Sequence, residues 1–359
     1  MSDPAGDPLQ TRFTRLVDCR LPIVQTGMGW VSGANLTAAT SAAGGFGILA
    51  AVTMTTEELR AAVRSVKERT DAPFGVNFRA DQPDLDDRVA FVVAEGVRLV
   101  SFAGAPTKDA VARCHEAGVL VMPTVGARRH AEKVLEMGVD AVIAQGGEGG
   151  GHTGVVPTTL LLPQVVDAVG AEIPVLGAGG FFDGRGLVAA LAYGADGIAM
   201  GTRFLLTQES RVPDAVKARY TAASVTDTVV TTALDGAPQR VIRTDVVDRI
   251  ERSPKLLRFP RAAAAAWRFS RETGTPVRDL VREGLAMRRN QDLTWSQVAL
   301  AANAPMLIKA TLVEGRVDVG VLPTGQATGV IDELPTVADL LARIEQEAKT
   351  ALHHLGGPR

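Results

Sequence analysis

Eight short apolar segments recur along the first two thirds of the chain, and their regular spacing is the feature that most constrains its fold. Most are followed by a turn containing Gly, Asn or Ser and then by an Ala- and Leu-rich stretch with helical periodicity. The segments begin 21 to 33 residues apart, which matches the length of one strand–helix unit. This pattern predicts strands at residues 22–26, 46–50, 74–78, 98–102, 119–124, 141–145, 174–179 and 197–201.

Eight strands that alternate with helices predict an α/β protein built as a (β/α)₈ TIM barrel. A doubly wound, Rossmann-like sheet is the alternative, and it should carry a GxGxxG pattern in the turn after its first strand. The turn after the first predicted strand instead reads QTGMGWVSG, and the most glycine-rich turns lie later in the chain. The sequence therefore favours the barrel.

The strand–helix repeat stops near Thr207, and prolines then interrupt helical stretches until about Val321. A capped amphipathic pattern, TVADLLARI, follows and predicts the last barrel helix. We therefore predict a barrel formed by residues 1–210 and 322–359. Residues 211–321, called the inserted segment below, are predicted to form a mostly helical substrate-binding (lid) domain between the eighth strand and the last barrel helix. Such an insertion leaves the barrel at the carboxyl ends of the strands, where active sites lie.

The overall composition excludes several classes of protein. The 359-residue chain has a formal net charge of −2 and a pI of about 6.3, which argues against a nucleic-acid or membrane-surface partner. The amino terminus lacks the apolar core of a signal peptide, and no apolar run reaches the length of a membrane span, so a cytoplasmic protein is expected. Cys19 and Cys114 lie far apart and no HExxH motif is present, so neither a disulfide framework nor a metal site is expected. A homo-oligomer stays an open alternative.

The inserted segment has an excess of basic residues. Between Arg211 and Asn290 the sequence has 16 Lys and Arg residues against 9 Asp and Glu residues. A basic cap over the barrel mouth would attract an anionic small-molecule substrate. A solvated helical surface explains the same residues equally well, and both interpretations stay open.

Two glycine-rich turns follow the last two predicted strands, GAGGFFDGRG at residues 177–186 and AMGTRF at residues 199–204. In TIM barrels these two positions commonly bind a phosphate through backbone N–H groups. The backbone and hydroxyl groups that would contact it belong to Gly179, Gly180, Gly201 and Thr202. A tight Gly-Gly turn that binds no ligand is the alternative.

The segment AQGGEGGGHTG, residues 144–154, follows the sixth predicted strand and reaches the same mouth. Its backbone suits close approach to a flat ring, with His152 directed at the reactive face. His152 would act as general base or hydrogen-bond donor, and the alternative is a structural histidine that binds loop carbonyls. Amides of Asn77 and Gln145 would contact the ring edge. The opposite side of this pocket would be closed by Gln25, Thr26, Gly27 and Met28.

The reactive chemistry is expected to come from a bound cofactor. The chain offers no metal site, no nucleophilic cysteine and no plausible Ser/His/Asp set. A phosphate site, a flat pocket and one histidine together point most simply to FMN. Because the chain shows no separate dinucleotide fingerprint, NAD is kept only as a candidate external electron acceptor.

Three stretches resemble motifs of the nitronate monooxygenase (2-nitropropane dioxygenase) family of FMN-dependent barrels: PIVQTGMGW, AQGGEGGGHTG and GAGGFFDGRGLVAALAYGADGIAMGTRFL. The resemblance covers residues 20–210 and resumes at GQATGVI. It implies an FMN-binding barrel with an inserted substrate domain and a catalytic histidine at His152. It also implies FMN contacts at Gln25, Thr26, Gly27, Met28, Asn77, Gln145, Gly150, Gly151, Gly179, Gly180, Met200, Gly201 and Thr202.

The chain departs from the nitroalkane enzymes of this family in two motifs. Gly27 precedes Met28 where a Pro-Met pair is usual, and Gly149 replaces an alanine in the loop before His152. Over most of its length the chain is more similar to a branch used in actinobacterial steroid degradation, through VQTGMGWVSGA, TRFLLT and LTWSQV. That branch comprises FMN-dependent dehydrogenases of a hydroxylated hydrindanone carboxyl-CoA ester. An anionic CoA thioester would suit a basic inserted segment.

Three other functions stay open from the sequence: a nitronate monooxygenase, an FMN-dependent enoyl-thioester reductase and a non-catalytic flavin-binding scaffold. A histidine beside the cofactor and a large lid favour an enzyme, because a scaffold needs neither.

Overall fold

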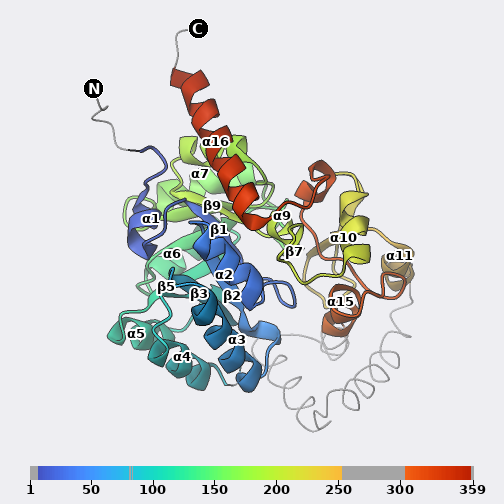
Figure 1. The fold of residues 1–359 in the computed structure, drawn as a ribbon, viewed down its shortest axis with the longest axis horizontal. Coiled ribbons are helices and arrows are strands. Elements are labelled where there is room, and N and C mark those ends of the chain that lie inside the picture. Colours follow the sequence, from blue (N-terminus) through green and yellow to red (C-terminus); the bar gives the residue numbers. More distant parts are fainter. Residues whose placement is uncertain (1–6, 81, 83, 253–303, 357–359) are drawn as a thin grey trace.

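Eight parallel strands close into a barrel in the computed structural model, which describes residues 7–80, 82, 84–252 and 304–356 (Figure 1). The strands are β1 (Ile23–Gln25), β2 (Phe46–Ala50), β3 (Phe74–Arg79), β4 (Leu99–Ala103), β5 (Leu120–Val125), β6 (Val142–Gln145), β8 (Val175–Ala178) and β9 (Gly197–Met200). The barrel closes where β9 pairs with β1, with Met200 opposite Gln25. Each strand lies within one residue of its predicted bounds, so the predicted TIM barrel is confirmed.

A helix follows each barrel strand and covers the outside of the barrel. These helices are α2 (Ala34–Ala42), α3 (Thr56–Arg69), α4 (Leu85–Ala94), α5 (Lys108–Glu116), α6 (Arg128–Leu135), α7 (Thr158–Val169), α8 (Gly184–Ala192) and, after the inserted segment, α16 (Val337–Gly356). Helix α16 packs against α8 and α2 and so completes the ring (Figure 1). In the described part of the chain, no helix combines the length and apolar character that crossing a bilayer requires.

The helix starts follow from local sequence. Thr55 and Glu58 form a capping box at the start of α3. The Asp183 carboxylate accepts a hydrogen bond from the Gly186 N–H at the start of α8.

Alternating strand residues divide the core into two shells. Val24, Ile48 and Leu99 point into the barrel, whereas their neighbours along the strands pack against the helices outside. Helix α1 (Arg12–Val17) covers the amino-terminal end of the strands, where Phe13 lies edge-on to Phe46 at 6.0 Å between ring centroids. The barrel is therefore closed at one end by apolar side chains, and any polar site lies at the other end.

The described part of the inserted segment contains three helices and two strands. Helices α10 (Asp214–Thr221), α11 (Asp245–Arg252) and α15 (Ala304–Leu312) lie together on one side of the barrel (Figure 1). Strands β10 (Thr228–Thr231) and β11 (Gln239–Ile242) form an antiparallel hairpin. The hairpin was not expected from the sequence. Residues 253–303, on which much of the helical prediction falls, lie outside the described residues, so the predicted domain bounds stay a prediction.

One short strand joins the inserted segment to the barrel. Strand β7 (Gly151–His152) pairs with β11 and forms the sheet order β10-β11-β7. In this pairing His152 lies opposite Gln239, and Gly151 lies opposite Arg240. The histidine singled out in the sequence therefore belongs to a sheet that both parts of the chain build.

Candidate active site at the barrel mouth

A layer of polar side chains forms the carboxyl-terminal end of the barrel interior. Because Leu99, Met122 and Ile143 belong to the inner core, the residues two positions further along these strands also point inward. Those residues are Ser101, Thr124 and Gln145. Together with Asn77 of β3, they give the mouth hydrogen-bonding groups from four neighbouring strands. Sequence reasoning missed Ser101 and Thr124, although extending the strand alternation by one step would have found them.

Asn77 is fixed from two sides. Its amide Nδ2 lies 3.4 Å from both the carbonyl oxygen and the hydroxyl of Ser101. The turn after β1 approaches it so closely that a Cβ atom at Gly27 would lie 2.4 Å from the Asn77 Cβ. Gly27 and Asn77, which the sequence assigned to the same pocket, are therefore in contact.

Gln25 stabilises the turn after β1 from beneath. Its fully buried side chain donates hydrogen bonds to Ser32 Oγ at 2.8 Å, to Ile48 O at 3.2 Å and to Thr26 O. Ser32 Oγ accepts in turn from Met28 N at 2.9 Å. Gln25 thus stabilises the turn that contains the other predicted residues, Thr26, Gly27 and Met28.

The turn after β1 also contacts the end of β9. Thr26 donates from its N–H and its hydroxyl to Met200 O, at 3.2 and 3.3 Å. A Cβ atom at Gly201 would lie 3.3 Å from Met28 Sδ. The side chain of Met200 is buried in the outer core, so this residue offers only its backbone to the mouth.

The turn after β8 presents backbone groups suited to an anion. Gly179 and Gly180 have φ angles of 103° and 82°, which favour glycine. Within the described residues, the N–H groups of Gly180 and Phe181 make no hydrogen bond. Across from them, Thr202 Oγ1 accepts from Gly325 N at 2.9 Å and keeps its own proton to donate. Free amides and a hydroxyl match the predicted phosphate site in chemistry.

Protein neighbours leave no room for a side chain at three glycines of the loop at residues 146–154. A Cβ atom at Gly146 would lie 2.1 Å from Thr158 Oγ1, one at Gly149 would lie 2.7 Å from Gln145 Nε2, and one at Gly150 would lie 2.5 Å from Gly325 N. Gly151 has a φ of 64°. Close packing of this loop against α7, β6 and the residues after α15 therefore explains why glycine is needed at these positions.

Glu148, which the sequence analysis did not select, ties the same loop to α7. Its carboxylate accepts from Thr158 N at 2.9 Å and from Thr158 Oγ1 at 2.7 Å. The residue at the N-cap of α7 is Pro157, which has no capping side chain, so a carboxylate from another loop takes over this role. A glutamate within a glycine run carries no sequence signal for such a long-range cap.

His152 is held at its backbone and at its ring. Gln145 Nε2 donates to His152 O at 2.7 Å, and β11 pairs with the other side of the strand. The His152 side chain is 67% exposed, and its Nε2 lies 2.7 Å from Oδ2 of Asp235, which is only 12% exposed. Burial acts to raise the pKa of Asp235, but hydrogen bonds and charge from His152, with bonds from Ala237 and Gln239, outweigh burial and lower this pKa.

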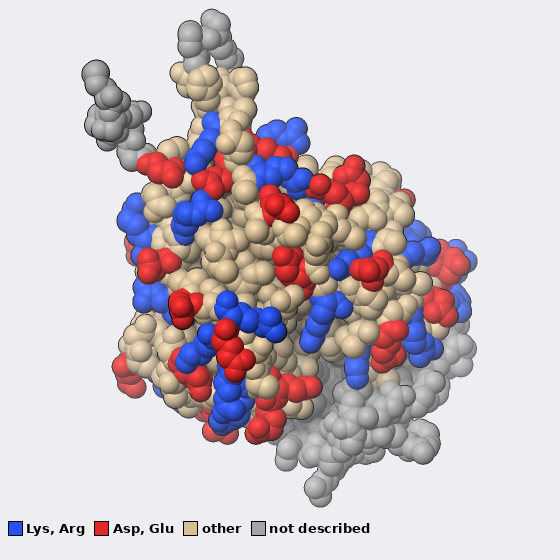
Figure 2. Space-filling model, viewed as in Figure 1, with Lys and Arg blue, Asp and Glu red and all other residues tan. Residues whose placement is uncertain are grey.

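Two arginines of the inserted segment serve as ties to the barrel loops. Arg240 donates to Gly147 O at 2.8 and 3.2 Å and to Thr228 Oγ1 at 2.9 Å. Arg211 Nε donates to Trp30 O at 2.8 Å, in the turn after β1. In the described part of residues 211–290, seven basic residues stand against six acidic ones, so the basic excess falls almost wholly in residues 253–290. Figure 2 accordingly shows basic and acidic side chains intermixed on the face in view.

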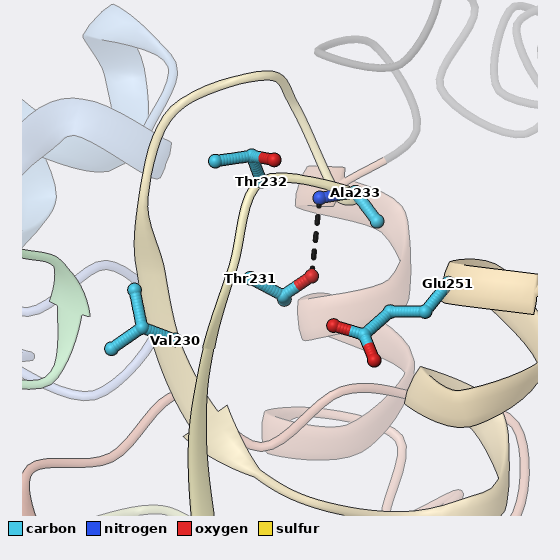
Figure 3. A pocket seen from close by; sticks show the side chains of 5 residues that line it. All are labelled: Val230, Thr231, Thr232, Ala233 and Glu251. Atoms are coloured by element: carbon cyan, nitrogen blue, oxygen red, sulfur yellow. Dashed lines mark hydrogen bonds between the residues drawn. The ribbon is translucent and has the colours of Figure 1, made fainter.

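A pocket of about 320 Å³ lies on the hairpin, apart from the barrel mouth (Figure 3). It is lined by Val230, Thr231, Thr232, Ala233 and Glu251. Thr231 Oγ1 accepts from Ala233 N at 3.2 Å and fixes one wall. A carboxylate and no basic group in the lining do not suit a phosphate, so this pocket is not the anion site described above.

Comparison with known proteins agrees with this geometry. The family model described as nitronate monooxygenase matches residues 10–90 and 85–347. The chain is 55% identical to (3aS,4S,5R,7aS)-5-hydroxy-7a-methyl-1-oxo-octahydro-1H-indene-4-carboxyl-CoA dehydrogenase of Mycobacterium tuberculosis, over 96% of this chain and 97% of the relative. It is 53% identical to the protein of the same name from Rhodococcus jostii, over 98% and 99% of the two chains.

Solved structures show the same architecture over nearly the whole chain. FabK from Thermotoga maritima is 34% identical with a TM-score of 0.77, covering 96% of this chain and 98% of that one. A nitroalkane oxidase from Streptomyces ansochromogenes is 29% identical with a TM-score of 0.75, covering 96% and 99%. The family match, the barrel and the polar mouth lead to one assignment: the chain belongs to the nitronate monooxygenase family and is a flavin-dependent oxidoreductase.

Proposed function

We propose that this protein is an FMN-dependent dehydrogenase of a hydroxylated hydrindanone carboxyl-CoA ester in steroid ring degradation. The observation that carries this proposal is the extent of the similarity. The two dehydrogenase relatives match 96% and 98% of the chain at 55% and 53% identity, so the match includes the inserted segment. A Staphylococcus saprophyticus protein named "Probable nitronate monooxygenase" matches only 67% of the chain at 32% identity.

The mouth of the barrel fits FMN in its donor set. The free amides of Gly180 and Phe181 and the hydroxyl of Thr202 would hold the phosphate. The inward-pointing Asn77 and Gln145 would contact the edge of the isoalloxazine ring. When bound, the flavin supplies the acceptor for the hydride that leaves the carbinol carbon of the substrate.

The chain's own part in the reaction is the movement of a proton. As the carbinol C–H bond breaks, a ring nitrogen of His152 takes the proton of the substrate hydroxyl, and the C–O single bond becomes a ketone carbonyl. The exposed His152 side chain at the rim of the mouth is accessible to a bulky thioester. NAD is the acceptor that we propose for the electrons in the second half of the cycle. The anionic CoA portion would be bound by basic residues of the inserted segment.

Anaerobic flavin reduction tests this function directly. Mixing the yellow protein with the hydroxyacyl-CoA should bleach the flavin absorbance, and His152→Ala should slow bleaching by about 10²–10⁴-fold, the usual contribution of a general base. His130→Ala, at an exposed position on α6, is the matched control and should bleach at the wild-type rate. No bleaching by the wild-type protein, or equal rates after His152→Ala, would contradict the proposal.

The same preparation separates the other two enzymatic functions. Rapid O₂ consumption with propionate 3-nitronate would identify a nitronate monooxygenase, and NAD(P)H oxidation driven by an enoyl-CoA would identify an enoyl-thioester reductase. A scaffold without activity is not supported, because the chain belongs to a family of enzymes.

A further inference from the structure

We propose that Asp235, in the hairpin turn between β10 and β11, is the positioning residue of His152 and sets which ring nitrogen accepts the substrate proton. This inference rests on the proposed function, in which His152 is the base. It gives the inserted segment a part in the chemistry itself, beyond covering the barrel and binding substrate.

The contact between the two side chains determines the tautomer. His152 Nε2 lies 2.7 Å from Asp235 Oδ2, across 83 residues of sequence. An ionised carboxylate only accepts hydrogen bonds, so Nε2 must carry the proton of this bond. Gln239 Nε2 lies 3.2 Å from the same ring nitrogen and also donates to Asp235 Oδ2, so the two N–H groups share one acceptor oxygen. Nδ1 is then the nitrogen with a free lone pair, and it is the atom able to take the hydroxyl proton.

The carboxylate is itself held in place. Ala237 N donates to Asp235 Oδ1 at 3.0 Å, and Gln239 Nε2 donates to Oδ2. Gln239 is also the residue opposite His152 in the β7–β11 pairing, so the groups around the imidazole share one rigid frame. The lowered pKa of Asp235 agrees with a carboxylate that stays ionised at neutral pH. A positioning residue must itself be held in place, because even a small rotation of a general base lowers the reaction rate.

Replacement by asparagine has a specific consequence in this geometry. The Ala237 N–H is fixed by the backbone and requires an acceptor at the Oδ1 position, whereas the Gln239 amide that donates to Oδ2 can turn over and accept instead. The amide oxygen of Asp235→Asn should therefore stay at the Oδ1 position. The amide nitrogen then faces His152 Nε2 and donates to it, which moves the ring proton to Nδ1 and blocks the proposed base. In Asp235→Ala the bond is simply missing, and both tautomers are available. We therefore expect Asp235→Asn to be slower than Asp235→Ala, whereas a purely structural role predicts the opposite order.

Two measurements test the inference. In flavin reduction by the hydroxyacyl-CoA, Asp235→Asn should lose at least about a hundredfold in kcat with little change in KM, as expected for a histidine held in the wrong tautomer. Asp235→Ala should lose less. Asp227→Asn is the control in the same segment and should leave the rate unchanged, since among the described residues the Asp227 carboxylate accepts only from Ser224 N.

Nitrogen NMR of ¹⁵N-histidine-labelled protein reads the tautomer without substrate. The His152 signals, identified by their loss in His152→Ala, should show a protonated Nε2 in the wild type and a protonated Nδ1 in Asp235→Asn. A wild-type Nδ1–H form, an unchanged tautomer in Asp235→Asn, or an Asn variant faster than the Ala variant would overturn the inference. If the tautomers behave as expected but wild-type flavin is not reduced by the thioester, the proposed function fails while the positioning of His152 by Asp235 stands.

Discussion

The backbone of Gly27 packs directly on Asn77, because a Cβ atom at position 27 would lie 2.4 Å from the Asn77 Cβ. The turn after β1 and strand β3, which contribute residues 50 positions apart in sequence, are thereby held at contact distance at the barrel mouth. Neither partner in this contact is the flexible end of a side chain. Any larger residue at position 27 must therefore displace the turn after β1.

Gly27→Ala should lower the affinity for flavin. The displaced turn would move Thr26 and Met28 relative to Asn77, and we expect about a tenfold rise in Kd, equivalent to about 1.4 kcal/mol. Titration of apoprotein with FMN, followed by quenching of flavin fluorescence, measures this change. An unchanged Kd would show that the turn does not contact the cofactor.

Gly150→Ala should destabilise the contact between the glycine-rich loop and residues Thr324 and Gly325, which follow α15. The new methyl group would lie 2.5 Å from Gly325 N and 2.5 Å from the carbonyl carbon of Thr324. Overpacking against backbone costs about 1–3 kcal/mol, which urea unfolding can measure. Gly154→Ala in the same loop is the control, since its Cβ would meet Gly126 O at an ordinary 3.5 Å. Equal stability of the two variants would contradict the described packing.

Glu148→Ala should destabilise α7. The variant leaves Thr158 N without its acceptor and removes the only side chain that caps this helix among the described residues, at a cost of roughly 1 kcal/mol. Glu148→Gln, which keeps one acceptor oxygen, should lose less. Amide hydrogen exchange in the first turn of α7 would locate the effect, and unchanged exchange there would argue against the cap.

The carboxylate of Glu345 on α16 should make stability depend on acid pH. Hydrogen bonds from Lys349 and Arg20 hold the pKa of Glu345 below its ordinary value of 4.5. Its stabilising contribution is therefore complete above about pH 4.5 and is lost as the pH falls through the lowered pKa. We expect Glu345→Gln to cost at most about 1 kcal/mol at neutral pH and nothing at strongly acid pH. Unfolding measured from pH 7 to 3, with the exposed Glu68→Gln as control, would show this convergence.

The barrel could be predicted from the sequence because its signals are local. Each strand is an apolar run of a few residues next to its own turn and helix, and such runs gave strand bounds within one residue. The contacts of Gln25 were less accessible, because its residue type and position do not show that its amide lies under the turn.

The pairing of β7 with β11 and the approach of Asp235 to His152 could not be predicted. Strand β7 has two residues, too few for a periodic pattern, and its partner is more than 80 residues away. Asp235 and Gly236 form an Asp-Gly pair that indicates a turn, but this pair does not show that the folded hairpin brings Asp235 to the imidazole. The roles given to the predicted site residues stay predictions until flavin binding is measured.

Because β10, β11 and β7 form one sheet, His152 lies where the inserted segment meets the barrel. An insertion joined to the barrel only at its two ends could be cut or exchanged without disturbing the barrel, but here β11 of the inserted segment pairs with the backbone of His152, the proposed base. We therefore expect that proteolytic cleavage of the hairpin would leave the barrel folded but disturb the position of His152. A chimera that exchanges the inserted segment between relatives would also need β7 from the same relative.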